Sequence, residues 1–88
     1  LAGLLNASQS NKDSDYRKSD RRLKKNISKV GISASGINIY SFEYKNPLHG
    51  SGLFQGVMSD DIPVEAVYSS GGYDVVDYSI LDVEFKAI

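Results

Sequence analysis

The stretch INIYSFEY, residues 37–44, has the strongest β-strand pattern in the chain and decides its fold class. Tyr40, Phe42 and Tyr44 recur at every second position, so the three rings lie on one face of the predicted strand. A loop rich in Asn, Pro and Gly follows at residues 45–52. We interpret the rings as a packed face of a sheet rather than as a platform for a sugar, and we therefore expect a fold built on strands.

Strand signals continue on the C-terminal side of this loop. Residues 53–58 form a second candidate strand, and Gly56 within it indicates a bulge or a close approach of the backbone to another group. The runs 64–68 and 73–78 flank the turn sequence SSGG at residues 69–72, and two β-rich runs on either side of a Gly-Gly pair predict a hairpin. We expect these segments to form a small antiparallel sheet with hairpins.

The C-terminal residues have the pattern of a helix. Ser79 and Asp82 form a Ser-x-x-Asp pair that can cap a helix start. Leu81, Phe85 and Ile88 follow at positions i, i+4 and i+7, which places them on one apolar stripe. Because about three turns are marginal for an isolated helix, we expect it to pack against partners or to continue beyond Ile88. The predicted fold class is α+β, a small antiparallel sheet with hairpins followed by this C-terminal helix.

The N-terminal part has a different composition. Residues 6–19 are rich in Asn, Ser, Gln, Lys and Asp, and such a segment is typical of a flexible linker. Leu1, Leu4 and Leu5 precede it and resemble the tail of an upstream element. Because the chain does not start with Met, we expect it to be a fragment of a longer protein whose folded part begins near Leu23.

Length and composition restrict the class of protein. Eighty-eight residues form one small domain or part of one, with a core too small for a cleft between two lobes. The chain has no Cys and one His, which excludes disulfides, thiolate metal sites and multi-histidine metal sites. We therefore expect neither a metal nor a cofactor. No apolar run approaches the ~20 residues of a membrane span, so no membrane partner is expected.

The charges are distributed unevenly along the chain. Residues 1–45 carry nine basic and four acidic side chains, and residues 46–88 carry one basic and seven acidic side chains. Seven of the cations lie between Arg17 and Lys29. Such a cluster is typical either of a patch for nucleic acid or phosphate, or of a solvated segment that faces acidic groups of its own fold or of a neighbouring subunit. We favour the second interpretation, because Tyr16 is the only aromatic residue beside the cluster.

The basic cluster contains the sequence SDRRLKKNI, residues 19–27, in which a Ser–Lys pair is possible. A serine hydroxyl becomes a good nucleophile when a base takes its proton, and a lysine amine with a lowered pKa can be that base. Neighbouring cations lower a lysine pKa, and Lys24 has Arg21, Arg22 and Lys25 around it. The pair needs no histidine, whereas His49, in its Pro/Gly loop, is a poor candidate for a triad.

The sequence from Ser19 to Ile27 resembles the opening motif of an auto-cleaving intramolecular chaperone domain. This domain is found at the C-terminus of phage endosialidase tailspikes and other tail fibres. Four further segments of the chain are similar to later motifs of the family and occur in the same order: residues 39–44, 56–61, 63–67 and 76–81. Ser59 and Asp60 stand where the family usually has Ala and Gln. The resemblance covers residues 19–88.

The resemblance implies that Ser19 is the nucleophile, that Lys24 is its general base and that the cleaved bond is Lys18–Ser19. Residues 1–18 would then be the end of an upstream fibre region with its flexible linker, and residues 19–88 the chaperone and self-cleaving peptidase domain, with its C-terminal helix truncated. The domain would form a homotrimer in which this helix packs, assist folding of the upstream fibre polypeptide, and cut itself once in cis. It would belong to the precursor of a virion tail fibre and act in the host cytoplasm during assembly.

Two alternatives come from other classes of function. The chain can be a non-cleaving trimerisation or receptor-binding tip that stays on a fibre. It can also be a small module that binds nucleic acid through the basic residues between Arg17 and Lys29.

Overall fold

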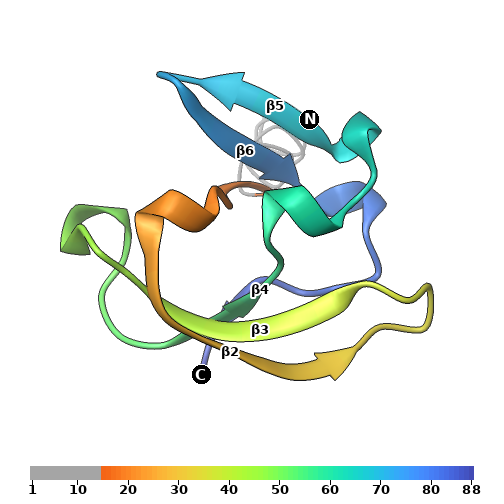
Figure 1. The fold of residues 1–88 in the computed structure, drawn as a ribbon, viewed down its shortest axis with the longest axis horizontal. Coiled ribbons are helices and arrows are strands. Elements are labelled where there is room, and N and C mark those ends of the chain that lie inside the picture. The colour runs from red at the N-terminus through yellow and green to blue at the C-terminus, as the bar shows by residue number, and fades with distance from the viewer. Residues whose placement is uncertain (1–14) are drawn as a thin grey trace, which may run out of the picture.

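The computed structural model describes residues 15–88, which fold into two antiparallel β-sheets (Figure 1). One sheet has the strand order β1-β6-β5, and the other has the order β2-β3-β4-β7. The strands are β1 (Tyr16–Lys18), β2 (Lys24–Ile32), β3 (Asn38–Tyr44), β4 (Phe54–Gly56), β5 (Val67–Ser70), β6 (Tyr73–Asp77) and β7 (Lys86–Ala87). Short 3-10 turns connect them: η1 (Arg21–Leu23), η2 (Pro47–His49), η3 (Ser59–Asp61), η4 (Val64–Ala66) and η5 (Tyr78–Ile80).

The strand predicted at residues 37–44 is confirmed as β3, which lies between β2 and β4 in the larger sheet. Its alternating pattern buries one face, where Phe42 is fully enclosed and Tyr44 is 5% exposed. The register pairs Lys24 at the start of β2 with Tyr44 at the end of β3. This pairing brings a lysine of the basic cluster next to the aromatic face.

The hairpin predicted around the Gly-Gly pair is also confirmed. β5 and β6 pair antiparallel, with Ser70 opposite Tyr73, so that Gly71 and Gly72 alone form the turn. Both glycines have positive φ, 61° and 84°, which a two-residue turn of this hand requires and which other residues adopt at a cost.

The core consists of two neighbouring clusters, and the partly buried ring of Phe85 packs against both. The first cluster contains Ile37, Val57, Val76, Tyr78 and Val83. The second contains Phe42, Tyr44 and Met58. The ring of Phe85 lies 5.3 Å from that of Phe54 and 5.7 Å from that of Tyr78, measured between ring centroids.

The predicted C-terminal helix is wrong, and with it the α+β class, because the described residues form a mainly β fold without an α-helix. The Ser79 backbone N–H and hydroxyl both donate to the Asp77 carboxylate, which caps the single turn η5. Asp82 instead accepts two hydrogen bonds from Ser35 in the β2–β3 turn. Phe85 turns inward ahead of β7, which pairs with β4. Ser79 and Asp82, the expected helix cap, thus bond to Asp77 and Ser35 instead. The end of the chain pairs with β4 as a strand.

The segment expected to be a linker also contains a strand. Residues Tyr16–Lys18 form β1 and pair with β6, so the folded part begins before Leu23. The rest of the expected linker, residues 6–14, and the leucines before it lie outside the described residues. Within residues 15–88, no helix is long and apolar enough to cross a membrane.

Candidate active site

The Lys18–Ser19 peptide bond lies where the chain leaves one sheet and enters the other. The backbone N–H of Ser19 donates to the carbonyl of Asp74 at 3.1 Å, which extends the β1–β6 pairing by one residue. The carbonyl of Ser19 accepts a hydrogen bond from the Ser59 N–H at 2.9 Å. Ser19 is fully buried. The bond expected to be cleaved is therefore held on its C-terminal side by two different elements.

Lys24, the expected general base, is buried at the start of β2 and is only 2% exposed. Its Nζ donates a hydrogen bond of 2.7 Å to the carbonyl of Val57 and lies 4.0 Å from the centroid of the Phe42 ring. Within residues 15–88, no acidic side chain forms an ion pair with this amine. An unpaired ammonium in such surroundings is costly, because burial removes its hydration.

Burial is the main reason why the pKa of Lys24 falls from 10.5 to about 7. The nearby positive charge of Arg21 lowers this pKa further, and the carboxylates of Asp20 and Asp60 act in the opposite direction. A large fraction of Lys24 is therefore a neutral amine at neutral pH. In that form, it can accept a proton from a hydroxyl group.

The hydroxyl of Ser19 faces the hydroxyl of Tyr78, with an Oγ–Oη distance of 3.3 Å. The Tyr78 hydroxyl also accepts a hydrogen bond of 2.9 Å from the Val57 N–H. Ser19 Oγ and Lys24 Nζ do not bond each other directly in the described structure, but both are tied to Val57, one through Tyr78 and the other directly.

Gly56 makes this arrangement possible. A Cβ atom at this position would lie 2.5 Å from the Tyr78 hydroxyl and 3.2 Å from Cε2 of Phe42. The close approach predicted from the glycine in this strand is thus confirmed. Any larger residue would have to displace the tyrosine that contacts Ser19.

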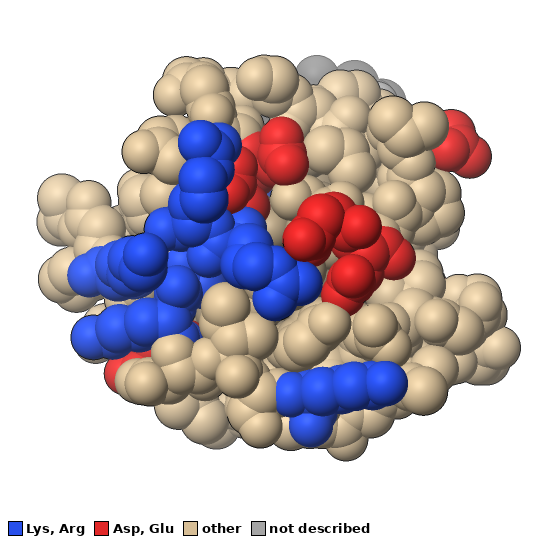
Figure 2. Space-filling model, viewed as in Figure 1, with Lys and Arg blue, Asp and Glu red and all other residues tan. Residues whose placement is uncertain are grey.

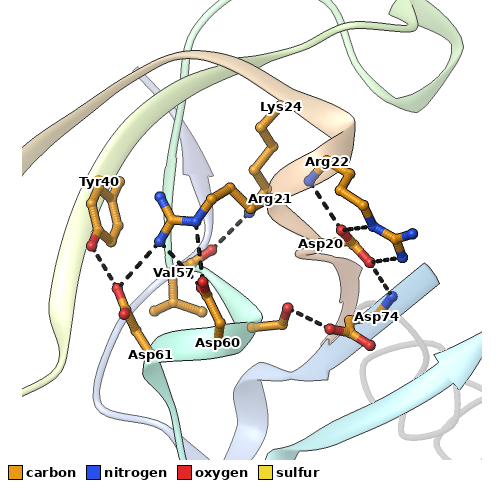
Figure 3. Close-up of polar contacts among 10 residues, drawn as sticks. Asp20, Arg21, Arg22, Lys24, Tyr40, Val57, Asp60, Asp61 and Asp74 are labelled. Carbon is orange, nitrogen blue, oxygen red and sulfur yellow. Dashed lines mark hydrogen bonds and ion pairs between the residues drawn. The ribbon is translucent and has the colours of Figure 1, made fainter.

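A network of polar contacts fixes the short segment between Ser19 and Lys24 (Figure 3). Asp20 caps the turn η1 by accepting from the Arg22 N–H, and its carboxylate also accepts from the Arg22 guanidinium and from the Asp74 N–H. Hydrogen bonding to Arg22 holds the pKa of Asp20 far below its usual value. The spacing of Ser19 and Lys24 is therefore set by a buried carboxylate that stays charged.

Arg21 joins the basic cluster to the acidic C-terminal half. Its guanidinium contacts both Asp60 and Asp61, at 3.1 and 3.8 Å, and it lies over the ring of Tyr40. Figure 2 shows basic and acidic side chains side by side on this face of the molecule. Part of the cluster thus faces acidic groups of its own fold.

The carbonyl oxygen of Lys18 faces the larger sheet and accepts a hydrogen bond of 2.8 Å from the Tyr44 hydroxyl. An open cavity of about 490 Å³ lies beside this contact and is lined by Lys18, Tyr44 and His49, among others. The ring of His49 stands edge-on to that of Tyr44, with 5.9 Å between ring centroids. In the described part of the chain, no group of His, Asp and Glu side chains is arranged to hold a metal ion.

The structure brings both expected site residues, Ser19 and Lys24, into one buried region and adds two tyrosines that the sequence did not indicate as site residues. The alternating pattern of residues 37–44 predicts that the Tyr44 ring packs in the sheet, and the ring is indeed buried. The pattern does not indicate that the Tyr44 hydroxyl contacts Lys18. Tyr78 falls in the segment 76–81 that resembles a family motif, and this was the only signal for it. Comparison with protein-family models, curated proteins and solved structures finds no match to this chain.

Proposed function

We propose that residues 19–88 are a self-cleaving serine peptidase that cuts the Lys18–Ser19 bond once, in cis. Ser19 is the nucleophile and Lys24 is the general base. The observation that carries the proposal is a buried lysine amine that forms no ion pair within residues 15–88. This amine is linked through Val57 and Tyr78 to a fully buried serine that adjoins the proposed scissile bond. A fold gains no stability from an unpaired buried lysine, whereas a reaction gains a base that is neutral near pH 7.

In the first step, the Lys24 amine removes the proton of the Ser19 hydroxyl, and Ser19 Oγ bonds to the carbonyl carbon of Lys18. The bond between this carbon and the Ser19 nitrogen breaks, and the proton passes from Lys24 to that nitrogen. The product is an ester between Lys18 and Ser19 Oγ, with a free amine on Ser19. The Lys24 amine must leave the Val57 carbonyl for this step and turn toward the Ser19 hydroxyl.

In the second step, water hydrolyses the ester. A water molecule attacks the Lys18 carbonyl carbon, and the bond between this carbon and Ser19 Oγ breaks. One proton of the water goes to Ser19 Oγ, the other goes to the free amine of Ser19, and Lys18 is left with a carboxylate. In this proposal, the water enters from the open cavity that Lys18 and Tyr44 help to line. The reaction consumes one water, restores the Ser19 hydroxyl and leaves Ser19 as a new N-terminus.

The biological role in this proposal is that of an intramolecular chaperone. The domain would assemble as a homotrimer on an upstream viral tail-fibre polypeptide in the host cytoplasm and then release it. Interwound fibres assemble slowly because their contacts are non-local, and removal of the chaperone traps the product kinetically. In this proposal, contacts between subunits would involve large apolar side chains that stand exposed: Val30, Ile32, Leu48, Leu53, Val64, Ile80 and Ile88. A stable monomer in sedimentation at micromolar concentration would contradict the trimer.

The test of the peptidase uses the 88-residue chain, synthesised chemically so that it first folds when it is diluted from denaturant. Intact-mass spectrometry then follows the appearance of two fragments. Ser19→Ala should abolish cleavage, because the attacking oxygen is lost. Lys24→Ala should abolish it through loss of the base, and Lys24→Arg should fail as well, because a guanidinium keeps its proton.

Lys25→Ala is the matched control, since Lys25 is the adjacent residue of the same type but is exposed to solvent. It should cleave at the rate of the wild type. Equal rates for Lys24→Ala and Lys25→Ala would show that Lys24 is not the base. An intact wild-type chain would favour the alternative of a fibre tip that does not cleave.

A further inference from the structure

The carbonyl oxygen of Lys18 is the atom on which negative charge would develop when Ser19 attacks. A peptidase gains much of its rate from hydrogen-bond donors aimed at this oxygen. The described structure holds one such donor in place before the reaction, since the Tyr44 hydroxyl donates to the Lys18 oxygen at 2.8 Å.

The strand register explains why this oxygen is open to Tyr44. In the antiparallel pair of β1 and β6, the Ser19 N–H donates to Asp74 and the Tyr78 N–H donates to Asp15. Residues 15 and 19 therefore occupy hydrogen-bonded positions, and Lys18, opposite Val75, occupies a non-hydrogen-bonded one. Its carbonyl consequently points away from β6, toward the end of β3.

Packing fixes the hydroxyl of Tyr44 firmly. The residue is 5% exposed, and its ring contacts those of Phe42, His49 and Phe54 at centroid distances of 5.4, 5.9 and 5.6 Å. Burial is the main reason why the pKa of Tyr44 is raised well above its usual value. The hydroxyl thus stays protonated at neutral pH and can act as a donor but not as a base.

We infer that Tyr44 is a further catalytic residue, whose hydroxyl stabilises the oxyanion that forms on the Lys18 carbonyl oxygen. This inference rests on the proposed function. Tyr44 lies directly opposite Lys24 in the β2–β3 register, so one pair of strand positions supplies both the base and the oxyanion donor. The two side chains act on different atoms, the base on Ser19 Oγ and the donor on the Lys18 oxygen.

The test compares Tyr44→Phe with Tyr40→Phe in the synthetic 88-residue chain, with the cleavage rate measured from pH 5 to 9. Tyr40 lies on the same strand, but its hydroxyl donates to Asp61, away from the scissile bond. Tyr44→Phe should slow cleavage roughly 100- to 1,000-fold. The midpoint of its pH profile should stay near 7, because Lys24 is unchanged. Tyr40→Phe should cleave at nearly the wild-type rate.

Two further measurements keep the result decisive. Thermal unfolding of Tyr44→Phe in a Ser19→Ala background shows whether the variant folds. If it does not fold, 3-fluorotyrosine at position 44, which is a more acidic donor, should accelerate cleavage, and an unchanged or lower rate would overturn the inference. A cleaving wild type with an equally fast Tyr44→Phe would overturn the inference alone, whereas an intact wild type would overturn the proposed function with it.

Discussion

Lys24 is the residue at which stability and the proposed function conflict most clearly. Its amine is buried against the Phe42 ring and donates a hydrogen bond to the Val57 carbonyl. The pKa of about 7, against 10.5 for an exposed lysine, means that the unfolded chain binds this proton more tightly than the folded chain. Lys24 therefore lowers the free energy of unfolding at every pH at which its amine is protonated in the unfolded chain, that is, below about pH 10.5.

The sign of this effect gives a test that does not depend on cleavage. The penalty is complete below pH 7, of the order of 5 kcal/mol, and shrinks as the pH rises toward 10.5. In a Ser19→Ala background, Lys24→Met should therefore gain more stability at pH 6 than at pH 9, by roughly 2–3 kcal/mol. Chemical denaturation at the two pH values measures this difference.

Methionine also loses the hydrogen bond to Val57, which reduces the gain. The difference between the two pH values depends only on the pKa of Lys24 in the folded and unfolded chains, so this difference is diagnostic. Lys25→Met, at an exposed position, is the control and should show little difference. If Lys24→Met changes stability equally at pH 6 and pH 9, Lys24 titrates normally and is a poor candidate for the base.

The predictability of the site differs from residue to residue. Ser19 and Lys24 could be predicted because both belong to one contiguous motif of the sequence. Tyr44 and Tyr78 could not, because their hydroxyls reach Lys18 and Ser19 only through packing between segments that are distant in sequence. A tyrosine on the buried face of a strand gives the same sequence pattern whether or not its hydroxyl has a chemical role.

At the scale of elements, β4 and the residue that follows it are the structural support of the site. Gly56 allows the Tyr78 hydroxyl to approach the strand, and Val57 then binds both Tyr78 and Lys24. Gly56→Ala should therefore displace Tyr78, lower the free energy of unfolding and slow cleavage. Kinetics by intact mass and thermal unfolding in a Ser19→Ala background measure the two effects.

Gly31→Ala in β2 is the matched control for this change. A Cβ atom at Gly31 would meet only Cδ1 of Ile39, at 4.0 Å, which is an ordinary contact. This variant should fold and cleave like the wild type. A Gly56→Ala chain with wild-type stability and rate would show that the close approach of Tyr78 is not needed.

The C-terminal element shows why a local pattern can mislead. Ser79, Asp82 and the stripe of Leu81, Phe85 and Ile88 have helical spacing, but the segment is short and isolated helices of this length are marginal. Non-local partners, Ser35 for Asp82 and β4 for β7, compete with the helix and prevail. The β3 strand and the Gly-Gly hairpin were predictable because their signals are local and agree with their surroundings.

At the scale of the whole molecule, the site lies at the junction of the two sheets. The two sheets lie one above the other in Figure 1. The smaller sheet carries the proposed scissile bond at the end of β1, and the larger sheet supplies Lys24 and Tyr44. Among the described strands, β1 pairs with β6 and has three residues. Its departure would break this pairing, the hydrogen bond between Lys18 and Tyr44, and the contact of Arg17 with the Phe85 ring. Cleavage at Lys18–Ser19 would thus release the upstream chain without dismantling the rest of the fold.

The origin of the new carboxylate tests the central claim most directly. The synthetic chain is folded in water enriched in oxygen-18, and the fragments are identified by mass spectrometry. The account predicts an N-terminal fragment that ends at Lys18 and carries one oxygen-18 atom, together with an unlabelled fragment that begins at Ser19. A chain that stays intact after folding, or a cut at any other bond, would contradict it.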